Sequence, residues 1–469
     1  MSKYILNKDC QLRGWDKLPF AIYSNSLRKA FFYDKEQYDM ILNFDGKKDI
    51  DVSMLNNRQK ECFDELIKHN VVIEASDNSE LLFNQLYKKY DCPYKEEVHW
   101  SITGRCNYKC KHCFMDAPIG AQGEPSFEDL CKELDAFERC GIKAVGITGG
   151  EPFVHPRFWD IIDECIKRDI RINVLYSNGL LVTKDVMEKL KEKQVFCSFQ
   201  FSYDGLGWHD WLRGIPGAEK AVDKAFKLCQ EYGAYTSASM VIHKHNVNTI
   251  VVSIKYLTSV GCYDLKINLA SPSGAWANQS EHFLSKEEYF KAILDLIPKY
   301  YEMGAPLNIV VDGYFQAKKD TGEWSMSYVR NVLEQNAHIT PVCACIKRNF
   351  YVSPKGIVMT CMPIAETKLE DKFPCMLDTP LENILNNSYY STASNTSVKD
   401  FFERNSKCRN CDYRLQCCGG CRGKAAQIGY DNFYVEEKEI CDFFLNGWKD
   451  KIQKIAQDSY NRFVSTDND

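Results

Sequence analysis

Three cysteines lie close together in the segment Cys106-Asn-Tyr-Lys-Cys110-Lys-His-Cys113. Thiolates with the spacing C-x3-C-x2-C on one tight loop can bind three irons of a [4Fe–4S] cube and leave the fourth iron open. An open iron can bind a substrate or a cofactor. A zinc loop is the alternative, although zinc sites usually take four ligands from paired CxxC units. The spacing therefore favours iron–sulfur chemistry.

Glycines and polar residues follow several apolar runs downstream of this loop. Gly149-Gly150-Glu151-Pro152 follows KAVGIT, and its two glycines let the backbone approach a ligand closely. The carboxylate of Glu151 can accept a hydrogen bond from an ammonium group. The guanidinium of Arg213 can pair with a carboxylate through two hydrogen bonds. Further polar residues follow later apolar runs: Ser177, Asn178, Ser202 and Asp204.

The carboxy-terminal part of the chain carries a second, larger set of cysteines. They could hold two further iron–sulfur clusters or two tetrahedral zinc ions. Spacing alone does not decide between these metals. The candidate ligands are Cys343, Cys345, Cys361, Cys408, Cys411, Cys417, Cys421 and Cys441.

The composition is that of an ordinary globular protein, apart from its cysteine content. Of the 469 residues, 45% are hydrophobic and 26% charged, enough to bury a core without disulfides. The 22 cysteines, in a chain whose start is not a signal peptide, indicate metal or redox chemistry in the cytoplasm. A net charge of -5 argues against a general nucleic-acid binder, and no apolar run approaches a membrane span in length.

Short apolar runs alternate with amphipathic helical segments from Glu97 onward. Six such pairs predict an α/β fold with a parallel sheet curved into a partial (β/α)6 barrel. The candidate residues then lie at the carboxyl ends of the strands, where barrel active sites form. The expected division of the chain is a winged-helix-like unit at 1–92, the barrel at 93–305, a linker or bridging region at 306–342, a Cys-rich domain at 343–445 and a helix or tail at 446–469.

Together these motifs resemble the radical S-adenosylmethionine (SAM) enzymes that carry a Cys-rich SPASM domain. The resemblance implies that the first three cysteines hold a catalytic cluster whose open iron binds SAM. In that family GGEP holds the methionine amino group, and the residue before the last cysteine, here His112, lies near the adenine. The other residues that the resemblance assigns to SAM binding are Ser177, Asn178, Ser202, Asp204 and Arg213.

The carboxy-terminal cysteines resemble the SPASM array, which binds two auxiliary [4Fe–4S] clusters and brings the total to three. The resemblance gives one auxiliary cluster Cys408, Cys411, Cys417 and Cys441. It gives the other Cys343, Cys361 and Cys421. Whether Cys345 is the fourth ligand of that second cluster stays open.

The N-terminal unit resembles the leader-recognition domain of enzymes that modify ribosomally made peptides. The resemblance implies a peptide maturase that forms a 5′-deoxyadenosyl radical from SAM and abstracts a hydrogen from a precursor peptide. Auxiliary clusters suit an oxidative outcome and favour a crosslink, with a Cys-derived thioether as the leading product.

Other products and one other activity remain open. Epimerisation and a carbon–carbon crosslink are alternatives to the thioether. A sulfatase-maturating activity is disfavoured because Met362 follows Cys361, where those enzymes usually place an acid. The expected partners are the precursor with its leader and a low-potential electron donor such as a flavodoxin or ferredoxin, with neither nucleic acid nor membrane.

Overall fold

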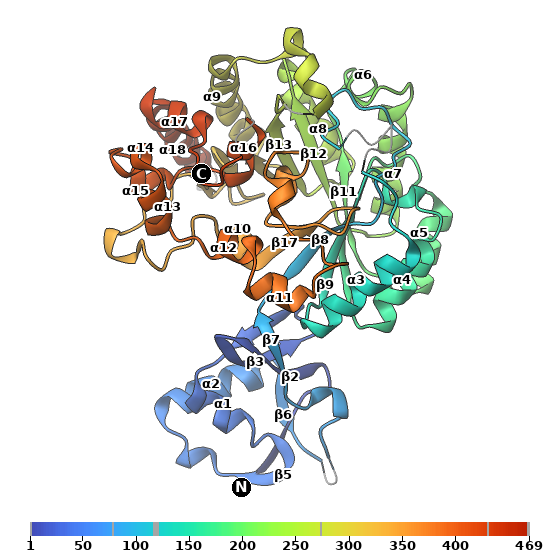
Figure 1. The fold of residues 1–469 in the computed structure, drawn as a ribbon, viewed down its shortest axis with the longest axis vertical. Helices are drawn as coiled ribbons and strands as arrows, with labels where there is room; N and C mark the ends of the chain where they lie inside the picture. The colour runs from blue at the N-terminus through green and yellow to red at the C-terminus, as the bar shows by residue number, and fades with distance from the viewer. Residues whose placement is uncertain (1, 77–78, 116–121, 273, 429–430, 467–469) are drawn as a thin grey trace.

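The computed structural model describes residues 2–76, 79–115, 122–272, 274–428 and 431–466. Within them, an eleven-stranded sheet contains the predicted six parallel strands, which alternate with helices (Figure 1). The strands are β8 (Glu97–Ser101), β9 (Ala144–Thr148), β10 (Arg171–Ser177), β11 (Ser198–Ser202), β12 (Thr236–Ile242) and β13 (Asp264–Leu269). The helices are α3 (Phe127–Arg139), α4 (Phe158–Lys167), α5 (Lys184–Glu192), α7 (Ala218–Glu231), α8 (Ile250–Ser259) and α9 (Lys286–Glu302).

Each strand–helix pair follows from its local sequence. β9 is buried along its whole length, which is typical of a parallel strand covered on both faces. The helices place apolar residues on one face, and α3, α5 and α9 begin at capping side chains. Ser126 caps α3 by accepting a hydrogen bond from the backbone of Asp129, and Thr183 caps α5. The apolar faces pack on the sheet and form the main core.

The sheet continues past the six predicted strands beyond β13. There β14 (Asn308–Val311) runs parallel to β13, and β15 (Phe315–Ala317) and β16 (Trp324–Ser325) follow in antiparallel pairing. These strands lie in 306–342, the segment expected to be a linker. β14 pairs with backbone groups that the edge of β13 would otherwise leave open, and β15 and β16 extend the sheet from β14. Local patterning does not reveal this requirement.

Beyond β8, the sheet continues into the Cys-rich part of the chain. β17 (Asn349–Val352) pairs in parallel with β8, and β18 (Val358–Met359) pairs with β17 in the antiparallel sense. Phe350 in β17 is buried. The Cys-rich region is therefore joined by backbone hydrogen bonds to the strand that leads into the Cys106 loop.

The N-terminal unit has its own core, which includes Leu6, Phe44 and Phe63. Trp15 connects it to the barrel by donating a hydrogen bond from Nε1 to the carbonyl of Cys140, 3.2 Å away. From residue 29 to residue 74 the order is strand, helix, strand, helix, strand. The elements are β1 (Ser2–Leu6), β5 (Asp45–Ile50) and β6 (Val72–Glu74) in one sheet, β2 (Cys10–Asp16), β3 (Leu18–Ser24), β4 (Lys29–Phe32) and β7 (Lys88–Pro93) in another, and the helices α1 (Lys35–Ile41) and α2 (Asn57–Lys68).

The carboxy-terminal region consists mostly of short helices and ends in one long helix that packs against α9. No helix of the described residues is long and apolar enough to cross a membrane. The elements are α10 (Ala344–Arg348), α11 (Leu381–Asn386), α12 (Tyr389–Asn395), α13 (Val398–Arg404), α14 (Ser406–Arg409), α15 (Arg414–Cys417), α16 (Arg422–Gln427), α17 (Lys438–Leu445) and α18 (Trp448–Thr466).

Candidate active site

The Cys106 loop leaves the carboxyl end of β8 and is fixed against α6 (His209–Arg213) by backbone hydrogen bonds. Lys109 donates to the carbonyl of Arg213 at 3.2 Å, and Lys111 donates to that of Leu212 at 2.9 Å. The three thiols influence one another. Burial raises the pKa of Cys106 to about 12, with smaller contributions from the nearby Cys110 and Cys113. The fold therefore brings the three predicted catalytic cysteines together.

Two polar side chains from other strand ends reach these thiols. Asn178 Nδ2 lies 4.0 Å from Cys106 Sγ and donates a 2.7 Å hydrogen bond to Asn107 Oδ1. Arg213 Nη1 lies 3.7 Å from Cys110 Sγ. Asn107, which the sequence analysis did not single out, leaves its own Nδ2 buried without a partner in the described structure. Its place inside the cysteine motif is the signal that could have identified it.

The two glycines of the GGEP turn bring that turn into contact with the Cys106 loop. A Cβ atom on Gly150 would lie 2.1 Å from the carbonyl oxygen of Arg105, and one on Gly149 would lie 2.5 Å from that of Thr103. Gly149 also has φ +152°. Backbone carbonyls of the neighbouring loop occupy the space beside the two glycines, and close approach of the turn to a ligand stays a prediction. The glycines therefore set the distance between two loops.

Glu151 is a buried carboxylate held by hydrogen bonds. Its oxygens accept from Ser177 Oγ at 3.0 Å and from the backbone N–H of Asn178 at 2.8 Å. Burial raises the pKa of Glu151 to about 7, although these bonds lower it. No Lys or Arg of the described residues forms an ion pair with Glu151, so a cationic ligand would complement it. Pro152 follows and starts a short 3-10 turn.

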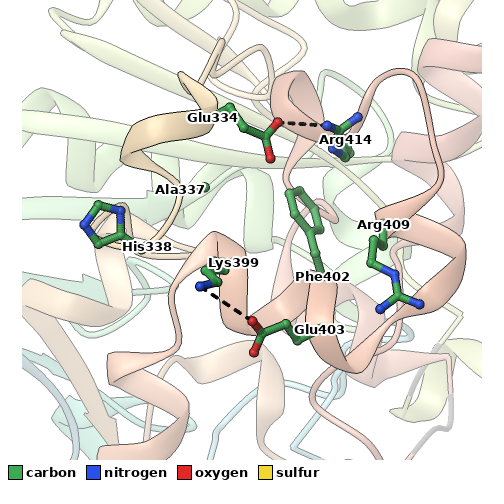
Figure 2. A pocket seen from close by; sticks show the side chains of 8 residues that line it. All are labelled: Glu334, Ala337, His338, Lys399, Phe402, Glu403, Arg409 and Arg414. Carbon is green, nitrogen blue, oxygen red and sulfur yellow. Dashed lines mark hydrogen bonds and ion pairs between the residues drawn. The ribbon is translucent and has the colours of Figure 1, made fainter.

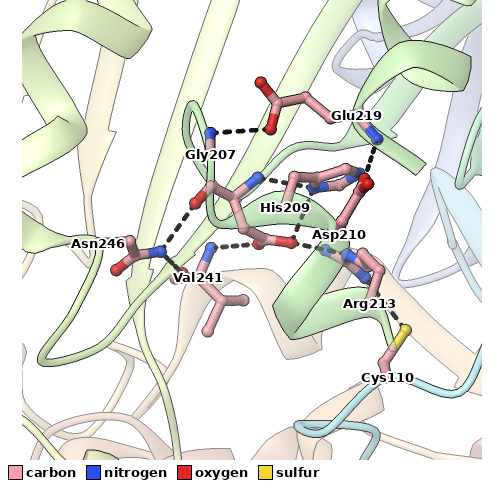
Figure 3. A network of polar contacts seen from close by, with 9 residues as sticks. Cys110, Gly207, His209, Asp210, Arg213, Glu219, Val241 and Asn246 are labelled. Carbon is pink, nitrogen blue, oxygen red and sulfur yellow. Dashed lines mark hydrogen bonds and ion pairs between the residues drawn. The ribbon is translucent and has the colours of Figure 1, made fainter. Parts of the chain in front are cut away.

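Asp204 is buried and makes polar contacts with Arg213, His209, Val241 and Asn246, which Figure 3 labels. Arg213 Nε donates to its carboxylate at 2.6 Å, and the backbone N–H of Val241 donates at 3.0 Å. His209 Nδ1 lies 3.1 Å from the carboxylate, and Asn246 Nδ2 donates to the Asp204 carbonyl at 2.8 Å. Burial raises the pKa of Asp204, but Arg213 and His209 outweigh burial and hold it well below its usual range. The ionised carboxylate thereby orients Arg213 toward Cys110.

His112 and Ser202 are the other two residues predicted to contact SAM. His112 Nδ1 is buried without a hydrogen-bond partner in the described structure. Burial, followed by the charge of Arg213, lowers the pKa of His112 to about 3, so the ring is neutral near pH 7. Ser202 ends β11 and is half-buried opposite Ser239 of β12. The structure brings His112 near Asp204 and Arg213, and it places Ser202 at the same strand ends.

An aromatic and histidine cluster beside the Cys106 loop was not predicted. Trp211 is its centre: Lys111 Nζ lies 5.1 Å from the Trp211 ring, and the His282 ring lies 4.8 Å away in an edge-on contact. His282 Nδ1 is 2.8 Å from His245 Nε2. The members come from three distant segments, so local sequence gave no signal of their contact. They are Trp208, Trp211, His243, His245, Trp276 and His282.

Four of the carboxy-terminal cysteines form one group. Burial raises the pKa of Cys408 to about 12, with contributions from Cys417 and Cys441. Burial also raises the pKa of Cys417 to about 12, with contributions from Cys411 and Cys441 among others. Cys418, which had no predicted role, is buried beside them. The group contains the same four cysteines that the SPASM resemblance assigned to one cluster.

The other four cysteines form a second group. Burial raises the pKa of Cys361 far above its usual range, with Cys421 and Cys343 adding to the effect. A hydrogen bond with Cys343 lowers the pKa of Cys345. Among the described residues, no three His, Cys, Asp or Glu side chains converge on a point that suits one metal ion. A cluster spreads its thiolates over different irons, so its ligands need not converge in that way.

Two hollows lie outside these cysteine groups. One, of about 460 Å³, lies in the carboxy-terminal region and is lined by residues that include Arg409 and Phe402 (Figure 2). Its charges are partly paired: Arg414 with Glu334 at 2.8 Å, and Lys399 with Glu403 at 3.8 Å. The other, of about 660 Å³, lies between α7 and the loop after β10.

The fold and the site define an α/β enzyme with a cysteine-bearing loop at the mouth of a partial barrel. The profile of the Radical SAM superfamily matches residues 100–257. This segment is a radical SAM domain.

The chain is similar over most of its length to several known proteins. It is 23% identical to the antilisterial bacteriocin subtilosin biosynthesis protein AlbA of Bacillus subtilis, over 90% of this chain and 90% of that protein. It is 24% identical to the AdoMet-dependent heme synthase of Nitratidesulfovibrio vulgaris, over 74% of this chain and 92% of that protein. The crystal structure of Streptococcus suis SuiB bound to precursor peptide SuiA is also similar, with a TM-score of 0.62 and 14% sequence identity. The match covers 93% of this chain and 99% of that chain. The structural match confirms the predicted fold.

Proposed function

We propose that the protein is a radical SAM maturase of a ribosomally made precursor peptide, and that it installs a crosslink, with a Cys-derived thioether as the favoured product. The observation that carries this proposal is the extent of the match to the bacteriocin biosynthesis protein. It leaves only a tenth of this chain unmatched, less than the length of the N-terminal unit. The shared part therefore includes some of the N-terminal unit, whereas the heme synthase matches 74% of the chain.

The residues of the Cys106 loop fit the catalytic [4Fe–4S] cluster and SAM. Burial raises the pKa of Cys106 and of Cys110, and the nearby Cys113 adds to both shifts, so the three thiols lie near one another, as the ligands of one cluster must. Asn107 Nδ2 and His112 Nδ1 are buried without partners in the described structure and can bind a group placed there. When bound, the cluster supplies the electron that breaks a carbon–sulfur bond of SAM.

The protein's own side chains hold and orient these groups. Glu151, a buried carboxylate without a cationic partner among the described residues, would accept from the amino group of SAM. Asp204 orients Arg213, which would donate toward the Cys110 thiolate and the SAM carboxylate. The neutral ring of His112 would contact the adenine, while Ser177 and Asn178 position Glu151 and would contact the ribose. Ser202 contributes at the end of β11.

The two carboxy-terminal cysteine groups would hold two auxiliary [4Fe–4S] clusters, which makes three in all. Their grouping supports this assignment, since each group contains four neighbouring thiols. The second group includes Cys345, which favours full ligation of its cluster. Crosslinking removes an electron from the substrate radical, and auxiliary clusters suit that oxidation. Epimerisation, which needs a hydrogen donor instead, is the weaker alternative.

The N-terminal unit would bind the leader of the precursor. Its three-stranded sheet has the order β5–β1–β6, so two outer strands offer backbone groups to an added strand. Ile73 on β6 is 37% exposed and gives such a strand an apolar contact. A flavodoxin or ferredoxin would supply the low-potential electron.

One experiment tests the reaction and its product. The protein is reconstituted with iron and sulfide without oxygen, then mixed with SAM, dithionite and a short Cys-containing peptide encoded next to its gene. We expect 5′-deoxyadenosine and a peptide lighter by two hydrogens for each crosslink. An unchanged peptide mass with inverted residues would support epimerisation. Absence of 5′-deoxyadenosine from fully loaded protein would contradict the proposal.

A further inference from the structure

The groove beside α7 is lined on one side by lysines. Lys220, Lys224 and Lys227 follow one another at helical spacing and share one face of α7. The loop after β10 forms the other wall, from Gly179 to Thr183. Glu231 is the one acidic side chain among the residues that line the groove. The α5 and α7 helices that flank it lie on the outer side of the barrel (Figure 1).

The positive charge of this groove is not neutralised by the protein itself. Lys220 and Lys224 are exposed and form no ion pair with any residue that the structure describes, whereas Lys227 pairs with Asp223 at 2.9 Å. The carboxy-terminal hollow of Figure 2 differs, because two of its cations are paired with glutamates. Leu180, 41% exposed, adds an apolar contact beside the lysines. The groove therefore combines charge and apolar surface for an acidic partner.

The wall of the groove is connected to the catalytic loop through one side chain. The backbone N–H of Leu180 donates to Asn178 Oδ1 at 3.0 Å. The amide nitrogen of the same Asn178 side chain lies 4.0 Å from Cys106 Sγ. The groove residue Leu180 is therefore linked to the Cys106 thiol through the Asn178 side chain.

We propose that this groove docks an acidic one-electron carrier protein, with a flavodoxin as the representative, and that its electron enters through Asn178 to the cluster held by Cys106. This inference rests on the proposed function. The reduced flavin, an anionic hydroquinone, loses one electron and becomes the neutral semiquinone. The oxidised cluster gains that electron, and no proton moves.

A carrier fits this groove better than the precursor peptide does. A peptide substrate must reach the carboxyl ends of the strands, where barrel chemistry occurs. The groove runs along the outer helix α7 and meets the site only through Asn178. Carrier complexes are small and transient and depend on charge complementarity, which two unpaired lysines and a leucine can supply.

The test compares two double variants that change the net charge equally. Lys220→Glu together with Lys224→Glu reverses the charge at two positions of the groove. Lys255→Glu with Lys454→Glu is the control, because these lysines are exposed on α8 and α18 and have no ion pair in the described structure. The Kd for oxidised flavodoxin is measured by calorimetry at low salt, with and without reconstituted clusters. Stopped-flow absorbance then follows electron transfer from reduced flavodoxin, with dithionite as the reductant that needs no docking.

We expect the groove variant to raise the Kd and to slow transfer from flavodoxin about tenfold, with a weaker salt dependence than the wild type. Reduction by dithionite stays unchanged, and the control variant matches the wild type. Equal losses in both variants would overturn the proposal. So would a loss of precursor binding with unchanged flavodoxin binding, which would make the groove a peptide site. A wild type that cleaves no SAM with dithionite contradicts the proposed function instead, while the Kd comparison still decides the docking site.

Discussion

The two cysteine-rich regions of the molecule are built differently. At the barrel mouth, the Cys106 and Cys110 thiols are contacted by Asn178 and Arg213, and Arg213 is itself fixed by Asp204. In the carboxy-terminal region most of the thiols lie on or next to helices of four to eight residues, and Cys417 has other cysteines as neighbours. The first region is shaped by the sheet before any cluster binds. The second lacks such a frame, so metal binding should contribute much of its stability.

The strongest test of this difference is Cys106→Ala. The change removes one ligand of the catalytic cluster, so we expect SAM cleavage to fall to background. The fold should persist, with the Tm changed by less than about 3 °C, because the loop is fixed by backbone bonds and the sheet. High-performance liquid chromatography of 5′-deoxyadenosine and scanning calorimetry measure the two effects. A large fall in the Tm would show that the barrel mouth also depends on its cluster.

The next largest effect is expected for Arg213→Lys. Lysine keeps the charge near Asp204 but lacks the planar fork that also reaches Cys110, so SAM cleavage should fall about 10–100-fold. The control is Arg168→Lys, at an arginine that pairs with Asp135 and Glu164 on outer helices. Cleavage rates and the affinity for SAM are measured for both. Equal rates in the two variants would remove Arg213 from the site.

Cys417→Ala tests the other region. We expect SAM cleavage without substrate to persist, since the barrel mouth is unchanged, and the Tm of the reconstituted protein to fall by about 5 °C or more. Cys418→Ala is the matched control, a buried neighbour with no assigned ligand role. Iron content and calorimetry distinguish them. Similar stability of both variants would mean that the carboxy-terminal region holds its shape without this cluster.

The smallest effect is expected at the contact between the two regions. Glu133 on α3 accepts a hydrogen bond from Trp100 and lies against Gly356 of the Cys-rich region. Burial raises its pKa from 4.5 to about 8. The stability that the protonated Glu133 side chain gives the fold is therefore complete below pH 4.5 and is lost as the pH rises through 8.

Glu133→Gln removes that dependence on pH. We expect the Tm of the variant minus that of the wild type to be about 3 °C higher at pH 9 than at pH 5. SAM cleavage should be unaffected. Glu128→Gln, at an exposed position on the same helix, serves as control. The same Tm difference between variant and wild type at pH 5 and at pH 9 would show that Glu133 does not titrate in this range.

The sequence predicted the barrel well because each of its helices and strands has a clear local pattern. The candidate ligands also followed from spacing, since the Cys106 motif is contiguous. What sequence could not show were contacts between segments far apart in the chain. The carbonyls of Thr103 and Arg105 fill the space beside Gly149 and Gly150, and the Trp211 cluster assembles from separate loops. The strands of 306–342 were missed because their pairing depends on the edge of β13.

The parallel pairing of β17 with β8 has a consequence for synthesis. β8 is the first strand of the barrel, yet its outer edge stays unpaired until the ribosome has made Asn349–Val352. Pairing over such a separation closes a long loop, which slows folding and leaves an open strand edge in the meantime. The nascent chain must therefore carry the Cys106 loop, with one side of its supporting strand uncovered, until most of the protein has been translated.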